Sequence, residues 1–595
     1  MTTATTSTCW EALAGRAVAR RQRVHRRCLR AFAASLALTA GGSAVAQAAA
    51  DAPPAAAQAA PVGPTAATPG TSTAPPASQA IPSWAELEAQ GARIGRIEVF
   101  ADDIFDLKDP KESYALFRAA NALHIQTRPQ VIRHALLFAT GDRVSVAVLD
   151  ETERLLRRNT YLHDVQIRPI AWRDGVVDIE VRTRDTWSLD LGVNFGRSGG
   201  ANSSRVRLKE YNLLGLGIGL SYGRSTTVDR TGNTFAISAD RVGGSWVSAA
   251  YSVSNNSDGR SQAVSLVRPF YSLDARWAAG FSFSDDKRID AVYDAGRIQS
   301  EFRRGERRAE AFFGWSSGRV NGWVQRTSFG LRLADDTFAR EPGRVAPAVL
   351  PSDRERRAPF VRYELIEDRY ERVVNRNLMG RPEWFPMGLN ARVELGWAAK
   401  QLGSSEDALM YAASVSRGFR PGPGVMLIAS GFATGEFSQG QVRRQRIGGE
   451  VEAYVPQGPR WLFFASVSGE RLSRGDPAEA LMLGGDNGLR GYPLRYQQGE
   501  RKLLATVEER YFTDLYWWRL FRVGMAGFVD VGRAWDSGQP TQARTGWLAD
   551  AGFGLRFVNT RSAYSNVLHV DLAVPLSAGS DIKKWQLLVK TKSSF

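Results

Sequence analysis

The serine of Gly314-Trp-Ser316-Ser-Gly318 has the spacing of a hydrolase nucleophile. In that class of enzyme the serine lies on a sharp turn between a strand and a helix, which exposes its hydroxyl to a neighbouring base. Here the flanking residues alternate as in two strands joined by a turn, and no helical pattern follows the serine. The sequence therefore predicts a serine within a β-sheet, and we expect no enzyme activity from this motif.

Histidine, cysteine and glycine, which could bind a metal or a phosphate, show no matching pattern either. Gly215-Leu-Gly217-Ile-Gly219 is rich in glycine, but no helix follows that would present its N-terminus to a phosphate. Cys9 and Cys28 are the only cysteines, and both lie near the N-terminus. The later histidines are scattered and lack zinc spacing; they are His124, His134, His163 and His569. We expect no cofactor and no bound metal, and we expect these histidines to have packing roles.

The residues beyond Trp187 alternate between polar and apolar in twenty segments of strand length, with no helical period between them. Val529 and Asp530, for example, fall on opposite faces of one segment. This pattern is typical of a transmembrane β-barrel, in which one face of each strand meets lipid and the other meets the lumen. No run of eighteen apolar residues follows the N-terminal region, which excludes a helical membrane protein. We predict an all-β transmembrane barrel over residues 185–595.

Two local sequences add detail to this prediction. Tyr516-Trp517-Trp518 lies at an expected turn between two strands, where an aromatic girdle of a membrane protein belongs. The basic run Arg303 to Arg308 (RRGERR) is expected to be a solvated loop or a rim that faces lipopolysaccharide. A soluble all-β protein is the alternative to the barrel.

The N-terminal region has the three parts of a secretory signal. Arginines between Arg20 and Arg30 form a basic segment, Ala31 to Ala40 is apolar, and small residues around Ala46 suit a signal peptidase. Residues 49–83 are mostly Ala, Pro, Thr and Gly, a composition that cannot bury a core. We predict a signal peptide over residues 1–48 and a disordered linker over residues 49–83.

The chain is basic, with a formal net charge of +16. The first 46 residues hold seven arginines and Glu11, a net of +6, which leaves +10 on the remainder. The sequence contains no recognition helix and no clustered basic arm, so nucleic acid is not an expected partner. The expected partners of the positive charge are outer-membrane lipid, lipopolysaccharide and acidic groups in the barrel lumen.

Residues 84–184 have a mixed pattern that differs from the segments after them. The predicted elements are a strand at Ile94–Phe100, helices at Tyr114–Ala122, after Pro129 and at Leu149–Leu156, and strands at Val165–Ile170 and Val176–Val181. Proline suits the first turn of a helix, and Asp174-Gly175 suits the turn between the last two strands. Three strands and two or three helices can close a small core, so this segment is predicted to be a small α+β domain.

The C-terminal part of the sequence resembles the BamA/TamA type of outer-membrane assembly proteins and their two-partner-secretion relatives. Four motifs carry the resemblance in the family's order: Leu489-Arg490-Gly491-Tyr492 is similar to the inward loop motif VRGF/Y, Glu508 and Arg510 to the acidic-x-Arg pair, Phe528-Val-Asp530-Val-Gly532 to FxDxG, and Gly552-Phe-Gly554-Leu-Arg556 to GxGxR. Residues 84–184 resemble a single POTRA (polypeptide-transport-associated) domain.

The resemblance implies a barrel whose loop folds into the lumen so that Arg490 meets Asp530 there. Gly491 is expected to let this loop turn sharply. The family's barrel has sixteen strands, whereas the count from this sequence is twenty. Phe595 is expected to serve as the terminal assembly signal, although Ser593 stands where the family often carries an aromatic residue.

The resemblance also implies a function without bond chemistry. The expected activity is insertion of polypeptides into the outer membrane or their translocation across it, with the POTRA domain in the periplasm and client polypeptides as its partners. Two alternatives remain open at this point: a passive outer-membrane pore, and a two-partner-secretion transporter for one dedicated exoprotein.

Overall fold

The computed structural model describes residues 81–595, except for residues 295, 537–545, 564–565, 578–581 and 593. The predicted signal peptide and almost all of the predicted linker lie outside the described residues. In the part of the chain that is described, no helix has the length and apolar character needed to cross a membrane.

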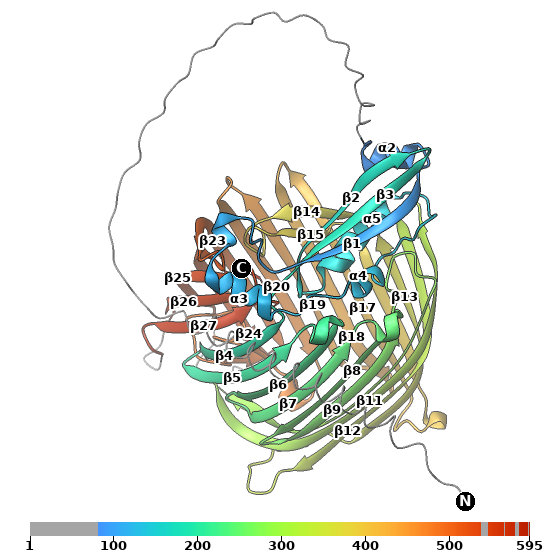
Figure 1. Ribbon diagram of the computed structural model, residues 1–595. Coiled ribbons are helices and arrows are strands. Elements are labelled where there is room, and N and C mark those ends of the chain that lie inside the picture. The colour runs from blue at the N-terminus through green and yellow to red at the C-terminus, as the bar shows by residue number, and fades with distance from the viewer. Residues whose placement is uncertain (1–80, 295, 537–545, 564–565, 578–581, 593) are drawn as a thin grey trace, which may run out of the picture. The chain divides into compact units, whose positions relative to one another are not determined.

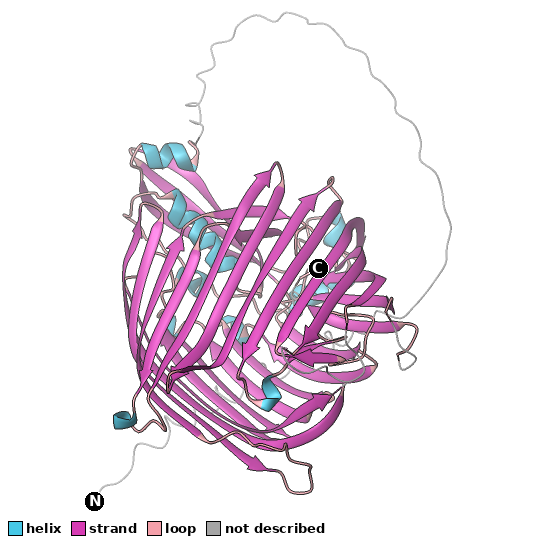
Figure 2. Ribbon diagram, turned by 180° about the vertical axis from the view of Figure 1, so that it is seen from behind, coloured by secondary structure: helices cyan, strands magenta, loops and turns pink. Residues whose placement is uncertain are grey.

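Twenty antiparallel strands close into one barrel (Figures 1 and 2). In the order of the chain they are β4 (Leu189–Ser198), β5 (Ala201–Glu210), β6 (Ile218–Thr226), β7 (Thr231–Ala239), β8 (Ser248–Asn256), β9 (Gly259–Arg268), β10 (Trp277–Asp294), β11 (Arg297–Val320), β12 (Trp323–Arg340), β13 (Arg354–Glu367), β16 (Asn390–Ala398), β17 (Ala408–Gly422), β18 (Val425–Ser438), β19 (Gln441–Pro456), β20 (Trp461–Ser473), β23 (Arg501–Trp517), β24 (Phe521–Trp535), β25 (Leu548–Asn559), β26 (Val567–Pro575) and β27 (Gln586–Lys592). Short 3₁₀ turns lie between some of them, namely η2 (Leu213–Gly215), η3 (Val242–Gly244) and η4 (Lys400–Leu402).

The count of twenty strands from the sequence is confirmed, and the expectation of sixteen from the family is wrong. Each of the twenty alternating segments overlaps one barrel strand. A barrel strand has one side toward lipid and one toward the lumen, so a segment with one apolar and one polar face fits it. The solvated loop expected at Arg303 to Arg308 is also wrong, whereas the alternative, a rim that faces lipopolysaccharide, stays a prediction. These residues lie within β11, where every second side chain faces the lumen. Arg304 is buried there, whereas the side chain of Arg303 is 58% exposed.

The alternation sorts apolar side chains to the outside of the barrel and polar ones to the inside. Val529 is 43% exposed and Asp530, the next residue, is fully buried. Large apolar side chains such as Phe195, Trp315 and Phe329 are all more than half exposed on the outer face. An apolar belt of this kind requires a non-aqueous surrounding.

The N-terminal elements include the three strands and three helices that the mixed pattern predicted, and also α2 (Trp84–Ala89) and η1 (Pro110–Glu112), which it did not predict. The predicted elements are β1 (Arg93–Asp102), α3 (Ala115–Leu123), α4 (Pro129–Arg133), α5 (Val146–Arg157), β2 (Leu162–Arg173) and β3 (Val176–Asp185), and the strands form a sheet in the order β1-β3-β2. Ile94, Leu149, Val177 and Ile179 are each at most 4% exposed in its core. That this segment is a POTRA domain stays a prediction.

By their contacts the described residues form two compact units. The first comprises the residues up to Glu98, Phe138–Asp150 and Gln166–Val181, and the second comprises Val99–Leu137, Glu151–Val165 and Arg182–Phe595. The barrel belongs entirely to the second unit.

Two connections of the barrel carry small sheets of their own. Since the strands alternate in direction, we call the end at which β4 begins and β27 ends the first rim, and the opposite end the second rim. The inward loop, residues 474–500, joins β20 to β23 at the second rim and contains η5 (Pro477–Glu479), β21 (Leu481–Leu483) and β22 (Gln497–Gly499). The rim hairpin, residues 368–389, joins β13 to β16 at the first rim and contains β14 (Tyr370–Val374) and β15 (Pro382–Pro386).

Candidate functional site

Arg490, in the inward loop, makes a bidentate ion pair with Asp530 of β24. Its Nε donates to Oδ2 of Asp530 at 2.6 Å and its Nη2 donates to Oδ1 at 2.8 Å. Its Nη1 donates to Oε1 of Glu508 on β23 at 2.8 Å. The side chain of Arg490 is 8% exposed, and those of Asp530 and Glu508 are 0% and 5% exposed. Such charge-assisted pairs in a nearly dry site are the strong kind of hydrogen bond.

An aromatic ring completes the surroundings of this guanidinium. The Arg490 Cζ lies 3.4 Å from the ring centroid of Phe528, within the range of a cation–π contact. Phe528 is 4% exposed and lies on the same face of β24 as Asp530, two residues away. The aromatic residue that opens the motif Phe528-Val-Asp530-Val-Gly532 therefore contacts the loop arginine, a role that the sequence did not reveal.

The charged residues of the other motifs extend this network across the neighbouring strands. Arg510 Nε donates to Glu508 Oε2 at 2.9 Å, and Arg556 donates to Asp571 of β26. All four side chains are at most 5% exposed. Sequence reasoning missed Asp571, although its alternation with His569 and Ala573 on the buried face of β26 was a usable signal.

The glycines of the motifs make room for neighbouring parts of the wall and the inward loop. A Cβ on Gly554 would lie 1.8 Å from Asp571 Oδ1, and one on Gly532 would lie 2.9 Å from a methyl carbon of Leu483 in the inward loop. A Cβ on Gly491 would lie 2.7 Å from the Cβ of Asp550. The expected turn at Gly491 is confirmed, since the N–H of Tyr492 donates to the carbonyl of Leu489 at 3.1 Å across it, although the φ of Gly491 is not positive. Glycine is needed at residue 491 because the loop touches the wall there.

The other two residues of the loop motif anchor it by packing. Leu489 and Tyr492 are both fully buried, in a cluster that also contains Leu483 and Leu548. Tyr492 donates its hydroxyl hydrogen to the carbonyl of Ala549 at 3.0 Å. The structure therefore brings together, between the inward loop and β23–β26, all the loop and lumen residues that the motifs indicated.

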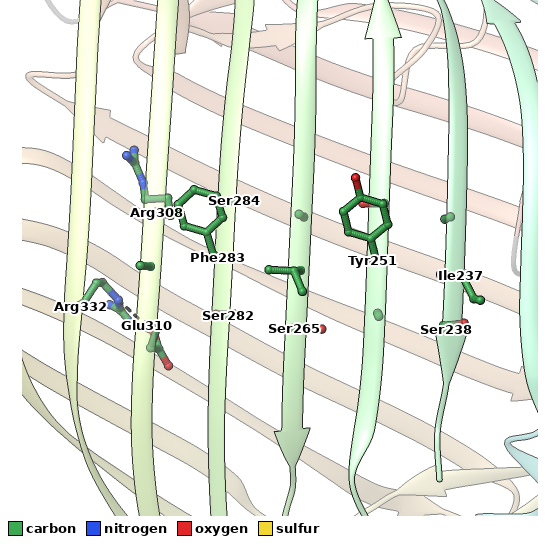
Figure 3. A pocket seen from close by; sticks show the side chains of 16 residues that line it. Ile237, Ser238, Tyr251, Ser265, Ser282, Phe283, Ser284, Arg308, Glu310 and Arg332 are labelled. Atoms are coloured by element: carbon green, nitrogen blue, oxygen red, sulfur yellow. Dashed lines mark hydrogen bonds and ion pairs between the residues drawn. The ribbon is translucent and has the colours of Figure 1, made fainter. Parts of the chain in front are cut away.

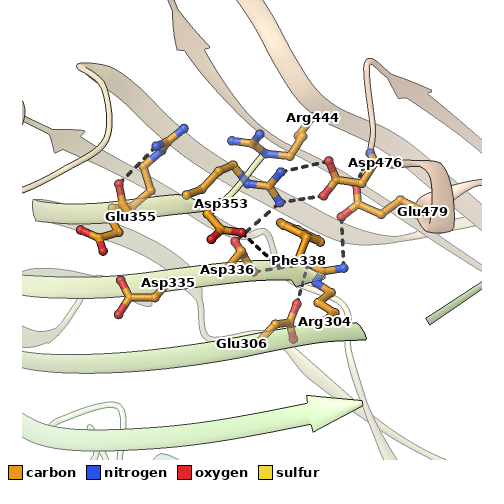
Figure 4. A network of polar contacts seen from close by, with 12 residues as sticks. Arg304, Glu306, Asp335, Asp336, Phe338, Asp353, Glu355, Arg444, Asp476 and Glu479 are labelled. Carbon is orange, nitrogen blue, oxygen red and sulfur yellow. Dashed lines mark hydrogen bonds and ion pairs between the residues drawn. The ribbon is translucent and has the colours of Figure 1, made fainter. Parts of the chain in front are cut away.

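The start of the inward loop is held by a second network (Figure 4). Asp476 accepts from Arg354 Nη1 at 3.0 Å and from Nη2 at 2.6 Å. Arg354 comes from β13, and Arg304 of β11 lies 3.9 Å from Glu479. The anchors on β11 and β13 and those on β23–β26 lie on strands that are far apart in the order of the barrel. The loop is therefore fixed to separate parts of the wall.

The seam between the last and the first strand is the weakest junction of the barrel. β27 and β4 share a single pair, Val589↔Arg197, whereas β26–β27 share seven pairs and β4–β5 share ten. The inward loop lies across this seam. The carbonyl of Gly485 accepts from Ser198 Oγ of β4 at 2.5 Å and from Lys590 Nζ of β27 at 2.6 Å. We call this double contact the Gly485 clasp.

A hollow of about 460 Å³ lies against the strands from β7 to β12 (Figure 3). Serines and alanines recur along it, among them Ser252, Ser265 and Ser282. In the picture Arg308, Glu310 and Arg332 gather at one side, where Arg332 Nε donates to Glu310 Oε2 at 3.1 Å. This part of the barrel wall carries small side chains and leaves the adjacent space unfilled.

The serine and the histidine considered above for chemistry are both buried and lie against backbone carbonyl groups. Ser316 is fully buried within β11, and its hydroxyl donates to the carbonyl of Gln325 at 2.8 Å. His569 is 1% exposed and its Nε2 lies 2.8 Å from the carbonyl oxygen of Ser594. Among the described residues, no group of three His, Cys, Asp or Glu side chains could hold a metal ion.

No family model matches the chain, and no curated protein matches it. Several solved structures are similar in fold. BamA from Haemophilus ducreyi lacking POTRA domains 1-3 shares 13% identity at a TM-score of 0.37, over 83% of this chain and 84% of that one. CdiB from Acinetobacter baumannii shares 13% at 0.42, over 84% and 73%, and CdiB from Escherichia coli shares 13% at 0.43, over 84% and 76%. Since each TM-score lies below 0.5, function is inferred from the residues of this chain alone.

Proposed function

We propose that this chain is an outer-membrane barrel protein that inserts polypeptides into the membrane or translocates them across it. The observation that supports this most is the seam between β27 and β4, with its single strand pair. Two strands joined by so few main-chain bonds separate at a lower cost than any other neighbours in this barrel. A separated edge offers unpaired N–H and C=O groups to a client strand.

The outer surface supports placement in a lipid bilayer. Phe195 is 73% exposed, Trp315 is 60% and Phe329 is 57%, and all three point away from the lumen. Trp517 and Trp518, at the turn between β23 and β24, are 45% and 62% exposed at the first rim. Tryptophans at this height suit the headgroup layer. Outer-membrane lipid and lipopolysaccharide are the proposed surroundings.

The N-terminal elements suit a periplasmic POTRA domain. In the sheet order β1-β3-β2, the strands β1 and β2 are the two edges. An edge strand can add a client strand by main-chain hydrogen bonds without regard to most of its side chains. We propose that client polypeptides first bind in this way and then reach the seam.

The inward loop would hold β23 and β24 in their places in the barrel while the seam opens. Arg490 ties it to β23 and β24, strands that do not border the seam. The Gly485 clasp ties the same loop to both strands of the seam. Release of the clasp would free both strands of the seam from the inward loop, while Arg490 holds the loop against β23 and β24.

Depletion in the native host tests this function. The amounts of outer-membrane and secreted proteins should fall when the chain is depleted, and the wild-type gene should restore them. The Arg490→Ala variant should restore them poorly, and Arg303→Ala, an arginine that is 58% exposed on the same barrel, should restore them fully. Unchanged levels of those proteins after depletion would contradict the proposal.

The hollow beside β7–β12 favours a second candidate, a passive pore for small solutes. Its serines and the Arg332–Glu310 pair would line a polar conduit. The full chain in a planar bilayer distinguishes the two candidates. Steady ohmic conductance that is equal in the wild type and in Arg490→Ala, together with no effect of depletion on other proteins, would support the pore.

A further inference from the structure

The rim hairpin is packed against the inside of the barrel. Phe385 of β15 is 7% exposed, and its ring centroid lies 5.7 Å from that of Tyr454 on β19. Met387 is 2% exposed, and its Sδ would lie 2.6 Å from a Cβ placed on Gly418 of β17. Both side chains belong to an apolar cluster that includes lumen-facing residues of β18–β20 and β23–β26. The hairpin is therefore a fixed part of the lumen at the first rim.

The tip of this hairpin, residues 375–381, has a built conformation. The carboxylate of Glu383 accepts from three successive backbone N–H groups, those of Arg376 at 3.1 Å, Asn377 at 3.2 Å and Leu378 at 3.0 Å. The side chain of Asn375 accepts from the N–H of Gly380 at 2.7 Å. A carboxylate that binds three consecutive donors holds a turn in one shape.

This ordered tip binds Phe595. The backbone N–H of Phe595 donates to the carbonyl of Asn377 at 2.7 Å. Its ring is 3% exposed and lies 4.9 Å, between centroids, from Phe512 of β23. A Cβ on Gly524 would lie 2.6 Å from the Phe595 ring and 2.9 Å from the Sδ of Met379 in the tip. Phe595 thus fills a pocket made jointly by the hairpin and the wall.

Two arginines of the wall complete the pocket. The Cζ atoms of Arg510 and Arg556 lie 5.4 Å and 5.7 Å from the Phe595 ring centroid. Arg510 Nη1 also donates to the carbonyl of Arg376 in the tip at 3.0 Å. The pocket therefore offers an apolar slot, cationic edges and one main-chain acceptor. Its ligand class is a peptide segment that carries an aromatic side chain next to a free backbone N–H.

We propose that the rim hairpin is an internal receptor for the segment that follows β27, and that it holds β27 in place at the first rim. β27 has one pair with β4, so its position depends on its pairing with β26 and on contacts from inside the barrel. The Gly485 clasp holds Lys590, and the hairpin holds Phe595 beyond the end of the strand. Release of Phe595 is therefore a step that must precede any outward movement of the end of β27.

The link between this release and client entry rests on the proposed function, but the binding of Phe595 by the hairpin does not. The test therefore uses no client. It uses a spin label on Ser594→Cys in the full chain with Cys9→Ser and Cys28→Ser, in lipid vesicles. The label in this parent protein should be immobile, because the next residue is bound in the pocket.

Three variants of this labelled protein decide the outcome. Glu383→Ala, which removes the acceptor of three N–H groups, and Phe595→Ala, which empties the pocket, should each give a mobile label. Arg372→Ala, an exposed position on the same hairpin, should leave it immobile. Each variant is first shown to keep the closed barrel by its electrophoretic migration in detergent gels without heating. If Glu383→Ala forms no closed barrel, Glu383→Gln replaces it; this variant keeps one acceptor oxygen but loses the negative charge, so its label should be more mobile than that of the parent.

A mobile label in the parent, or an immobile label when residues 370–386 are replaced by a Gly-Ser linker in a closed barrel, would overturn the proposal. If the label behaves as expected but depletion of the protein changes no other outer-membrane protein, the receptor stands and the proposed function fails. The two ideas can therefore be rejected separately.

Discussion

Replacement of Arg490 by alanine is the perturbation for which the structure gives the clearest magnitude. It removes a guanidinium that is 8% exposed and that binds Asp530 through two hydrogen bonds and Glu508 through one. Asp530 keeps a bond from Thr506 Oγ1 at 2.8 Å, and Glu508 keeps its bond from Arg510. Removal of one partner of a buried pair costs roughly 3–5 kcal/mol, because a buried charge loses its counter-charge.

A loss of 3–5 kcal/mol corresponds to roughly a 10²- to 10⁴-fold change in the equilibrium constant of unfolding. Urea unfolding of the barrel in lipid vesicles, followed by tryptophan fluorescence, measures it. Arg303→Ala is the matched control. Its ion pair with Glu341 is at the surface, with the arginine 58% exposed, and should cost about 0–1 kcal/mol. The double variant Arg490→Ala/Asp530→Ala should be less destabilised than the sum of the single variants. Equal stability of Arg490→Ala and Arg303→Ala would refute the reasoning that the loop arginine is buried and paired.

Two further predictions concern the packing of the wall and the free space in the lumen. Gly554→Ala should lower the free energy of unfolding by about 1–3 kcal/mol, because its Cβ would lie 1.8 Å from Asp571 Oδ1. Gly527→Ala is the control. It has open space around its Cβ and should change the free energy of unfolding by less than about 0.5 kcal/mol in the same urea assay. Ser265→Trp should reduce the conductance of the full chain in a planar bilayer, because it fills the hollow beside β7–β12, and Ser265→Ala should leave the conductance unchanged. Unchanged conductance in Ser265→Trp would show that no conducting path passes along these strands.

The strands could be predicted from the sequence because the signal is local. A residue on a barrel strand meets either lipid or lumen, so the period of two is written into each segment without knowledge of its partner. The expected site depended on local motifs of the same kind, since Asp530 and Arg556 each lie two residues from a glycine of their own motif. The run at Arg303 misled because a charged segment predicts solvent, whereas Arg304 pairs inside the lumen with Asp336, 3.5 Å away.

The remaining features could not be predicted because each depends on a partner far away in the sequence. Arg354 and Asp476 are 122 residues apart, and nothing near either one identifies the other. Asn377 and Phe595 are likewise distant in the sequence, and only the closed barrel places the rim hairpin beside Phe595. The weakness of the seam is equally invisible in the sequence, since both β4 and β27 alternate as well as the other strands do.

A disulfide across the seam tests the central claim most directly. Arg197 and Val589 are the paired residues of β4 and β27, so Arg197→Cys/Val589→Cys in a chain with Cys9→Ser and Cys28→Ser should cross-link them. Val193→Cys/Val206→Cys, a pair in the fully bonded β4–β5 ladder, is the control. In a depleted host, the oxidised seam variant should fail to restore the levels of outer-membrane and secreted proteins, and addition of a reductant should restore them. The control variant should restore these levels whether it is oxidised or reduced. Full restoration by the oxidised, cross-linked seam variant would contradict the account, because polypeptides would then be handled without the seam opening.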